Sequence, residues 1–285
     1  MNDSSDDQWE PLAPRARGNI LSIDLEDWYH ISGVDHTRYL LETLTTAGVT
    51  ATFFVLGKVA EREQALIREV AAAGHEIASH GWSHEPLTRL TPAALQNELE
   101  RSCSLLQTLA GVRPLGFRAP CFSVSMSTLW VFDVLIATGF RYDSSIFPFQ
   151  GRRYGIPGFP REPVRIQRAG GSILEVPLST LRVGGRNWPV AGGGYFRLLP
   201  YRLIRRAMRA INAEQLPFVT YCHPYEFGRG LLLHTRRQPP FTWLGARLDE
   251  LMTNLFRSTM RRKLAYLLRD GAFSSFAHVL QYDLA

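Results

Sequence analysis

Two histidines four positions apart, His80 and His84, are the residues of this chain best suited to bind a metal. An acidic run from Asp24 to Asp27 precedes them, and His223 follows far downstream. Two imidazole nitrogens and one carboxylate that leave a coordination position open are typical of a catalytic metal, usually zinc, which activates water. The spacing therefore predicts hydrolysis at a metal.

The acids of this run, Asp24, Glu26 and Asp27, differ in how they could reach such a metal. Side chains alternate along a strand, so Asp24 and Glu26 share a face. Asp27 could reach the metal if the chain turns after the strand. We therefore expect Glu26 or Asp27 to supply the carboxylate ligand and favour Glu26, while one of the three acids could instead cap a helix or pair with an arginine.

Segments of strand and helix type alternate along the chain from about residue 19. Hydrophobic patterning predicts strands at residues 19–23, 50–56, 75–78, 116–118, 140–142, 173–176 and 218–221. Helical spacing predicts helices at residues 36–47, 58–73, 91–110, 125–138 and 200–214. The alternation indicates a parallel sheet with crossover helices, and about seven units predict an irregular (β/α)7 barrel of the α/β class.

Every candidate catalytic residue directly follows a predicted strand. These residues are the acidic run 24–27, His80 and His84, Arg118, Asp143, and His223. Because barrel active sites lie at the C-terminal ends of the strands, the pattern predicts that they meet in one site.

Three segments follow from the composition along the chain. Residues 1–18 are polar and are expected to be a disordered tail, and residues 19–230 to be the catalytic domain. Within that domain the Gly/Pro/Arg-rich stretch 148–197 is expected to form long loops. Residues 231–285 are expected to be a helical extension packed on the barrel. Peripheral association of this basic extension with an anionic membrane or a partner is the alternative.

The charge of the chain narrows the function classes. The formal net charge is +6, but the arginines are spread along the sequence without a nucleic-acid-binding signature, so no nucleic-acid partner is expected. Three scattered cysteines argue against a disulfide framework. The acidic first residues lack the features of a secretion signal, and no apolar run is long enough to span a membrane. A cytoplasmic location is the default expectation.

Four stretches, taken together and in this order, resemble a known family: 24–28, 79–84, 116–120 and 222–227. The family is that of the polysaccharide deacetylases with NodB homology, carbohydrate esterase family 4. The resemblance covers roughly residues 19–230 and is strongest to members from bacterial exopolysaccharide and exosortase gene clusters. It implies a barrel fold, a divalent metal, most commonly zinc, and an N-acetylated oligo- or polysaccharide as substrate.

The resemblance also implies roles for individual residues. Asp24 matches the general base, and His223 matches the general acid that protonates the leaving amine. Arg118 matches the arginine that holds the base, and Asp143 the acid that orients this arginine. Cys121 stands where the family uses a backbone N–H to bind the oxyanion.

The metal ligands match the family only in part. His80 and His84 match its two nitrogen ligands, whereas its pair of adjacent aspartates is replaced here by the run Asp-Leu-Glu-Asp. Tyr221 stands where the family has a leucine in the acetyl pocket. Trp28 and Trp82 flank the motifs and are candidates for stacking on a sugar, although such rings are more often simply packed.

The resemblance thus implies a metal-dependent hydrolase that removes N-acetyl groups from an amino sugar in a bacterial exopolysaccharide or its lipid-linked precursor. Two alternatives stay open. The altered acidic run and Tyr221 allow an amidase that opens small cyclic ureides or imides. A non-catalytic, glycan-binding member of a biosynthetic complex is the other.

Overall fold

The computed structural model describes residues 8–12, 18–27, 34, 36–151, 154–228, 230–232, 251–281 and 283–284. Its strands are β1 (Gln8–Pro11), β2 (Asn19–Leu25), β3 (Thr52–Val55), β4 (Glu76–Ser79), β5 (Gly116–Phe117), β6 (Tyr142–Asp143), β7 (Val164–Arg168), β8 (Gly171–Glu175), β9 (Thr180–Val183), β10 (Arg186–Pro189), β11 (Val219–Cys222) and β12 (Phe273–Ser274). Its helices are α1 (Thr37–Ala47), α2 (Gly57–Arg62), α3 (Gln64–Ala72), α4 (Pro92–Ala110), α5 (Val131–Ala137), α6 (Gly193–Leu198), α7 (Tyr201–Ala213), α9 (Met260–Asp270) and α10 (Phe276–Leu280).

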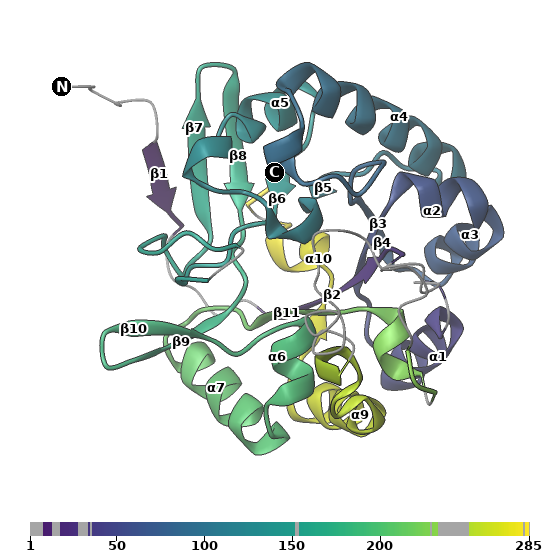
Figure 1. The fold of residues 1–285 in the computed structure, drawn as a ribbon, viewed down its shortest axis with the longest axis vertical. Helices are drawn as coiled ribbons and strands as arrows, with labels where there is room; N and C mark the ends of the chain where they lie inside the picture. The colour runs from purple at the N-terminus through teal and green to yellow at the C-terminus, as the bar shows by residue number, and fades with distance from the viewer. Residues whose placement is uncertain are drawn as a thin grey trace.

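The centre of the fold is a run of parallel strands in the order β8-β6-β5-β4-β3-β2-β11. Helices surround these strands (Figure 1). The chain beyond β8 approaches the opposite edge of the sheet, where the Ser179 N–H donates to the Val219 carbonyl at 3.2 Å. The sheet therefore curls towards closure, and the predicted α/β architecture of an irregular (β/α)7 barrel is confirmed.

The central strands are hydrophobic on both faces because helices cover the outside and side chains fill the inside. All seven residues of β2 and all four of β3 are buried. Ser22 and Asp24 are the polar exceptions that β2 turns inward at the catalytic end, and both contact one buried arginine. The strand thus serves the core and the site at once.

Helix ends follow the expected signals in two clear cases. The hydroxyl of Thr91 accepts the N–H of Ala94 at 3.2 Å and caps α4, and Pro92 occupies its first turn. Gly48 ends α1 with a left-handed φ of 64°. The predicted helix 58–73 is divided at Glu63 into α2 and α3.

The strand predicted at 173–176 is present as β8, but the long loops expected in the rest of the stretch 148–197 are largely replaced by regular elements. This stretch contains β7, β8, the hairpin of β9 and β10, and α6. The hairpin turns at Gly184 and Gly185, whose φ values of 59° and 78° match the turn that suits a two-residue hairpin. The glycine pair was visible in the sequence, but the short flanking strands lack a clear alternation.

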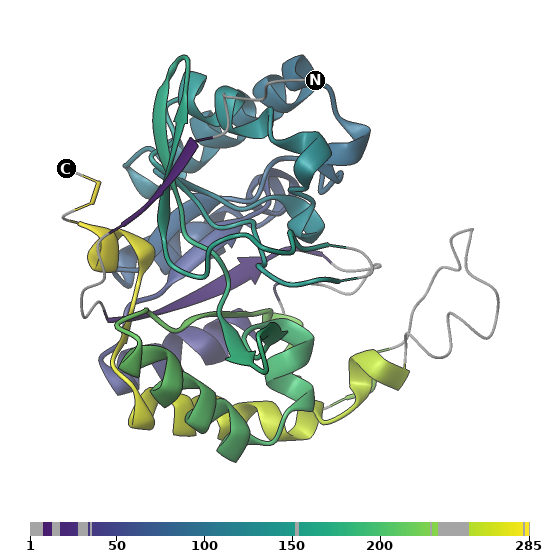
Figure 2. The same ribbon diagram turned by 90° about the vertical axis from the view of Figure 1, so that its left-hand side faces the viewer.

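The two ends of the chain also differ from the predictions. Within the tail expected to be disordered, β1 pairs antiparallel with β7, and Trp9 packs on Phe159 with ring centroids 5.1 Å apart. The C-terminal extension is not wholly helical, since β12 pairs in parallel with β2. Its helix α9 lies alongside α7 on one flank of the barrel (Figure 2). Within the described residues, no helix has the length and apolar character needed to cross a membrane.

Candidate active site

The two histidines meet one carboxylate at the catalytic end of the barrel. Oε2 of Glu26 lies 2.8 Å from Nε2 of His80 and 2.6 Å from Nε2 of His84. One ligand atom from each of these three residues lies within 4.8 Å of the others. Asp27 instead forms a two-pronged ion pair with Arg62, at 2.6 and 3.0 Å. Of the two carboxylates that the sequence left open, the geometry brings Glu26 to the histidines.

A tight loop, not a helix, presents the two imidazoles. His80 follows β4, and the chain then turns through left-handed backbone at Gly81 (φ 77°) and His84 (φ 67°). The carboxylate of Glu98 accepts the backbone N–H groups of Trp82 and Ser83 at 3.1 and 3.2 Å and fixes this loop. The spacing of four residues works here because the loop folds back on itself.

The protonation of His80 suits a metal ligand. Its Nδ1 lies 2.8 Å from the carbonyl oxygen of Arg118, which can only accept, so Nδ1 carries the proton. Nε2 then offers its lone pair on the side of Glu26. A ligating histidine that donates its other N–H to a carbonyl is the arrangement usual in zinc sites.

The charges of this cluster fit a cation. Burial on its own would raise the pKa of Glu26, but the adjoining imidazoles, His84 first, outweigh it and hold the pKa well below its usual value. The carboxylate is thus ionised although Glu26 is 3% exposed. Two nitrogens and one oxygen converging on one point are a donor set that fits zinc.

Arg118 holds Asp24, as the family resemblance implied. Nη1 of this wholly buried arginine lies 2.6 Å from Oδ1 of Asp24 and 2.8 Å from the hydroxyl of Ser22. Nε and Nη2 donate to the carbonyl and hydroxyl oxygens of Ser144 at 2.9 and 3.0 Å. The guanidinium also lies 4.1 Å above the ring centre of Phe54. Asp24 is therefore held in a single position by a fully satisfied charge.

Asp143 makes no direct hydrogen bond to Arg118 among the described contacts, so its role as the acid that orients Arg118 stays a prediction. Oδ1 of Asp143 accepts the Ser145 hydroxyl at 2.6 Å, and Ser145 in turn accepts the N–H of Ala119 at 2.7 Å. Asp143 has Glu175 as its register partner on the adjacent strand. Asp143 and Arg118 end different strands, and Ser144 contacts the guanidinium. Through Ser145, Asp143 supports the loop after Arg118.

Asp143 and Glu175 form a buried pair of carboxyl groups. Burial raises the pKa of Asp143, and burial together with the neighbouring Asp143 raises the pKa of Glu175 well above its usual value. Oδ2 of Asp143 and Oε2 of Glu175 are both buried without a conventional donor. A proton shared by the two carboxyl groups satisfies both atoms.

His223 lies beside the cluster, with Nε2 3.5 Å from Oε1 of Glu26. Oε2 of Glu226 accepts the backbone N–H of His223 at 2.9 Å and lies 3.3 Å from its Nδ1. Arg197 pairs with the other oxygen of Glu226 at 2.5 Å. Burial lowers the pKa of His223, but Glu226 and Glu26 outweigh it and raise the pKa to about 9.

Glu226 and Arg197 were missed by sequence reasoning. A signal for Glu226 existed, since a glutamate three residues after the start of a short helical turn commonly bonds back to that start. Arg197 has no such signal, because its position in α6 precedes Glu226 by 29 residues.

These groups line one cavity of about 500 Å³. Its wall includes Asp24, Glu26, His223, Tyr221 and Cys121. The backbone of Cys121 is left-handed, with φ 57°, and the expected use of its N–H stays a prediction. The ring of Tyr221 meets that of His223 edge-on, with centroids 5.4 Å apart.

Of the two tryptophans that were candidates for stacking on a sugar, the structure describes Trp82. Trp82 is only 6% exposed and packs against Gly57, and the guanidinium of Arg101 lies 3.5 Å from its ring centre. It does not line the cavity, so its predicted role in stacking on a sugar is wrong: the ring faces the helices instead. Trp28 lies outside the described residues.

Residues 16–140 match the family model described as polysaccharide deacetylase. This part of the chain belongs to the polysaccharide deacetylase family. The family predicted from the motifs is thereby confirmed. Residues 144–281 of the chain match a second model, a domain of unknown function named DUF3473. This second match crosses residue 230, where the sequence predicted a boundary.

The relatives described next match about half of the chain or less. A peptidoglycan deacetylase-like protein, FGM2, from Gibberella zeae is 32% identical over 139 residues, which are 48% of this chain and 40% of that protein. A chitooligosaccharide deacetylase from Bradyrhizobium sp. is 36% identical over 100 residues, 35% of this chain and 43% of that protein. The chain thus spans less than half the length of these relatives.

Solved structures share the fold of this chain. A Mycobacterium smegmatis protein assigned to the polysaccharide deacetylases has a TM-score of 0.59 at 22% identity, over 96% of this chain and 95% of that one. A carbohydrate esterase family 4 pseudoenzyme from Bacillus anthracis has a TM-score of 0.51 at 12% identity, over 94% and 66% of the two chains. At these identities the likeness concerns the fold alone.

Removing one carboxylate distinguishes the two metal-ligand candidates. We expect Glu26→Gln to weaken zinc binding by more than the roughly 10- to 100-fold that loss of an outer-shell partner costs, because an amide is a poorer ligand. Zinc content after dialysis, measured by mass spectrometry, checks this. Asp27→Asn is the matched control and should keep its zinc, and the reverse pattern would assign the ligand to Asp27.

The Asp143–Glu175 pair predicts a loss of stability as pH rises. In the unfolded chain the two groups titrate near their usual values of about 3.9 and 4.3, but in the folded protein the pKa values are higher. The folded state therefore holds an extra proton above about pH 4, and the stability that it contributes is lost as pH rises through the folded pKa.

Glu175→Gln should flatten this dependence, because the amide donates to Asp143 without a titrating proton. Urea unfolding at pH 5 and pH 8 should show a smaller fall in the free energy of unfolding than in the wild type. We expect the difference to be about 1 kcal/mol or more, since one pH unit of displaced titration corresponds to ~1.4 kcal/mol. Glu100→Gln, at an exposed site, is the control. Equal pH dependence in all three proteins would contradict the shared proton.

Proposed function

We propose that this chain is a zinc-dependent hydrolase that removes N-acetyl groups from an amino sugar in a bacterial exopolysaccharide or its lipid-linked precursor. One observation carries the proposal. Asp24, which Arg118 fixes, Glu26 and His80 of the metal-ligand cluster, and His223 all border a single cavity. A proton acceptor, a metal-ligand set and a proton donor are the groups that amide hydrolysis requires.

The chain's own residues supply the proton transfers. Asp24 is held in position by the guanidinium of Arg118, so its carboxylate can accept a proton from the attacking water. His223 is held by Glu226, which favours the protonated imidazole, so it can deliver a proton to the departing amine.

Glu26, His80 and His84 would hold the metal. The chemistry that a zinc ion supplies when bound is polarisation of a carbonyl oxygen and acidification of water. The N–H of Cys121 is the proposed second donor to the oxyanion, since Cys121 follows the fixed Arg118 loop in the cavity wall.

The cavity supports a sugar-sized substrate. Its volume of about 500 Å³ is within the range usual for small-ligand sites. Phe122 and Tyr221 give it an apolar side, with ring centroids 4.9 Å apart. Relatives are named chitooligosaccharide and peptidoglycan deacetylases, which supports an N-acetylated amino sugar. The assignment to an exopolysaccharide rests on the motif resemblance.

Tyr221 favours one second candidate. Its ring packs closely on Gly192, where an added Cβ would meet it at 2.0 Å, and it lines the cavity at the position where the resemblance places a leucine of the acetyl pocket. A smaller, planar substrate such as a cyclic imide is compatible with that wall. Turnover of cyclic imides without release of acetate from N-acetylated oligosaccharides would favour this amidase.

Acetate release from chitooligosaccharides tests the proposed reaction. Asp24→Asn should lower kcat by about 10²- to 10⁴-fold, the contribution usual for a general base. Asp133→Asn removes an exposed carboxylate that pairs with Arg168 and should leave the rate unchanged. A chelator should abolish wild-type activity and added zinc restore it. Undiminished acetate release by Asp24→Asn, or by chelated enzyme, would contradict the mechanism.

A further inference from the structure

Helices α7 and α9 border a groove of about 1000 Å³ on the flank of the barrel. Six cationic residues line it, and no acidic residue does: Arg202, Arg205, Arg206, Arg262, Lys263 and Arg269. We call this surface the basic groove. The chain has 32 lysines and arginines in all, and here six of them line one surface without an acidic residue among them.

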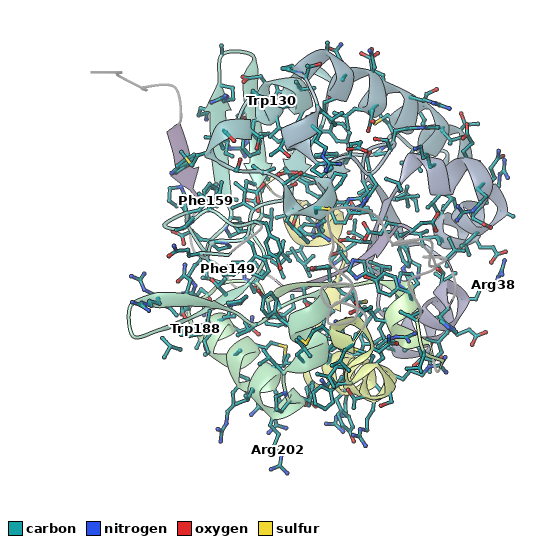
Figure 3. The ribbon with its side chains drawn as sticks, viewed as in Figure 1. Arg38, Trp130, Phe149, Phe159, Trp188 and Arg202 are labelled. Carbon is teal, nitrogen blue, oxygen red and sulfur yellow. The ribbon has the colours of Figure 1, made fainter. Side chains whose placement is uncertain are left out.

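Only some of these cationic groups form hydrogen bonds or ion pairs within the protein. Lys263 turns inward, and its ammonium donates to the carbonyls of α6 residues and of Leu199. Asp270 pairs with Arg269 at 2.8 Å and lies 3.6 Å from Arg205. The other three arginines have no ion-pair partner within the described residues; they are Arg202, Arg206 and Arg262. Figure 3 shows Arg202 pointing away from the body of the protein.

Large apolar side chains share the basic groove with these arginines. Leu203 and Phe256 are each 50% exposed, and Tyr266 is 37% exposed. Three further exposed apolar residues precede Phe256 in the chain: Leu251, Met252 and Leu255. A cluster of exposed apolar side chains on a soluble surface commonly marks a contact site.

We propose that the basic groove docks on a membrane that contains anionic phospholipids. Arginine binds phosphate through two parallel hydrogen bonds, so the unpaired guanidinium groups match lipid headgroups. The neighbouring Leu203 and Phe256 can enter the boundary between headgroups and acyl chains. These exposed apolar side chains favour a bilayer over a dissolved polyanion, because a dissolved polyanion offers no apolar phase.

The basic groove adjoins the cavity of the candidate active site. Arg197 of α6 lines the cavity, whereas Leu198, the next residue, lines the groove. The segment after residue 251 also borders both surfaces, since Thr253 lines the cavity and Phe256 lines the groove. A docked membrane would therefore lie next to the catalytic cavity, although docking itself does not depend on the proposed reaction.

Vesicle sedimentation tests the proposal with the full chain. The wild type should bind vesicles of phosphatidylcholine mixed with phosphatidylglycerol and should not bind phosphatidylcholine alone, and added sodium chloride should release it. The triple variant Arg202→Gln, Arg206→Gln and Arg262→Gln should bind roughly 100-fold more weakly, since each basic residue at an anionic surface contributes about a factor of five. Three lysines at these positions should preserve binding.

Two further variants separate this surface from general charge. Arg68, Arg182 and Arg186 are exposed arginines on α3 and the β9–β10 hairpin, and changing all three to glutamine should leave vesicle binding intact. Leu203→Ser with Phe256→Ser should weaken vesicle binding but leave binding of soluble dextran sulfate unchanged.

Several results would overturn the proposal. One is a wild type that does not bind anionic vesicles. Another is equal loss of binding when the three groove arginines and when the three control arginines are changed to glutamine. A third is full vesicle binding by the Leu203→Ser, Phe256→Ser protein together with displacement by dextran sulfate, which would identify a site for a soluble polyanion.

Discussion

The buried guanidinium of Arg118 is the constraint on which the site depends. A charge without solvent is costly unless every donor is satisfied, and here Asp24, Ser22 and Ser144 satisfy it. These partners come from β2 and from the chain after β6, so the strands must adopt one register. The carbonyl of the same arginine also accepts the His80 N–H. One residue thus fixes both the proposed base and the orientation of a metal ligand.

Charged groups around this centre are arranged so that none is buried alone. Glu26 faces two histidines and lies 3.5 Å from a third, His223. On the far side of His223, Glu226 is balanced by Arg197. Asp143 instead meets another acid, Glu175, and burial raises the pKa of both carboxyl groups. The cavity therefore combines a proton acceptor fixed by Arg118, a protonated donor and a carboxylate suited to bind a cation within a small volume.

Local patterns predicted much of the fold and site, whereas contacts between distant residues escaped prediction. The strands around Asp24 and His80 were readable because their apolar runs end in polar motifs. The partner of Asp143 could not be predicted, because the pairing depends on the register between its strand and that of Glu175, 32 residues later. The burial of Trp82 depends on Arg101 from α4 in the same way. Strand β1 was missed since its pairing with β7 leaves no periodic signal in four residues.

X-ray diffraction at the zinc absorption edge, from crystals grown with zinc and acetate, tests the central claim most directly. The account predicts one strong anomalous peak about 2.0–2.2 Å from the carboxylate of Glu26 and Nε2 of His80 and His84. Acetate should lie beside it, between Asp24 and His223. A peak on the carboxylate of Asp27, or none among the three proposed ligands, would contradict the account.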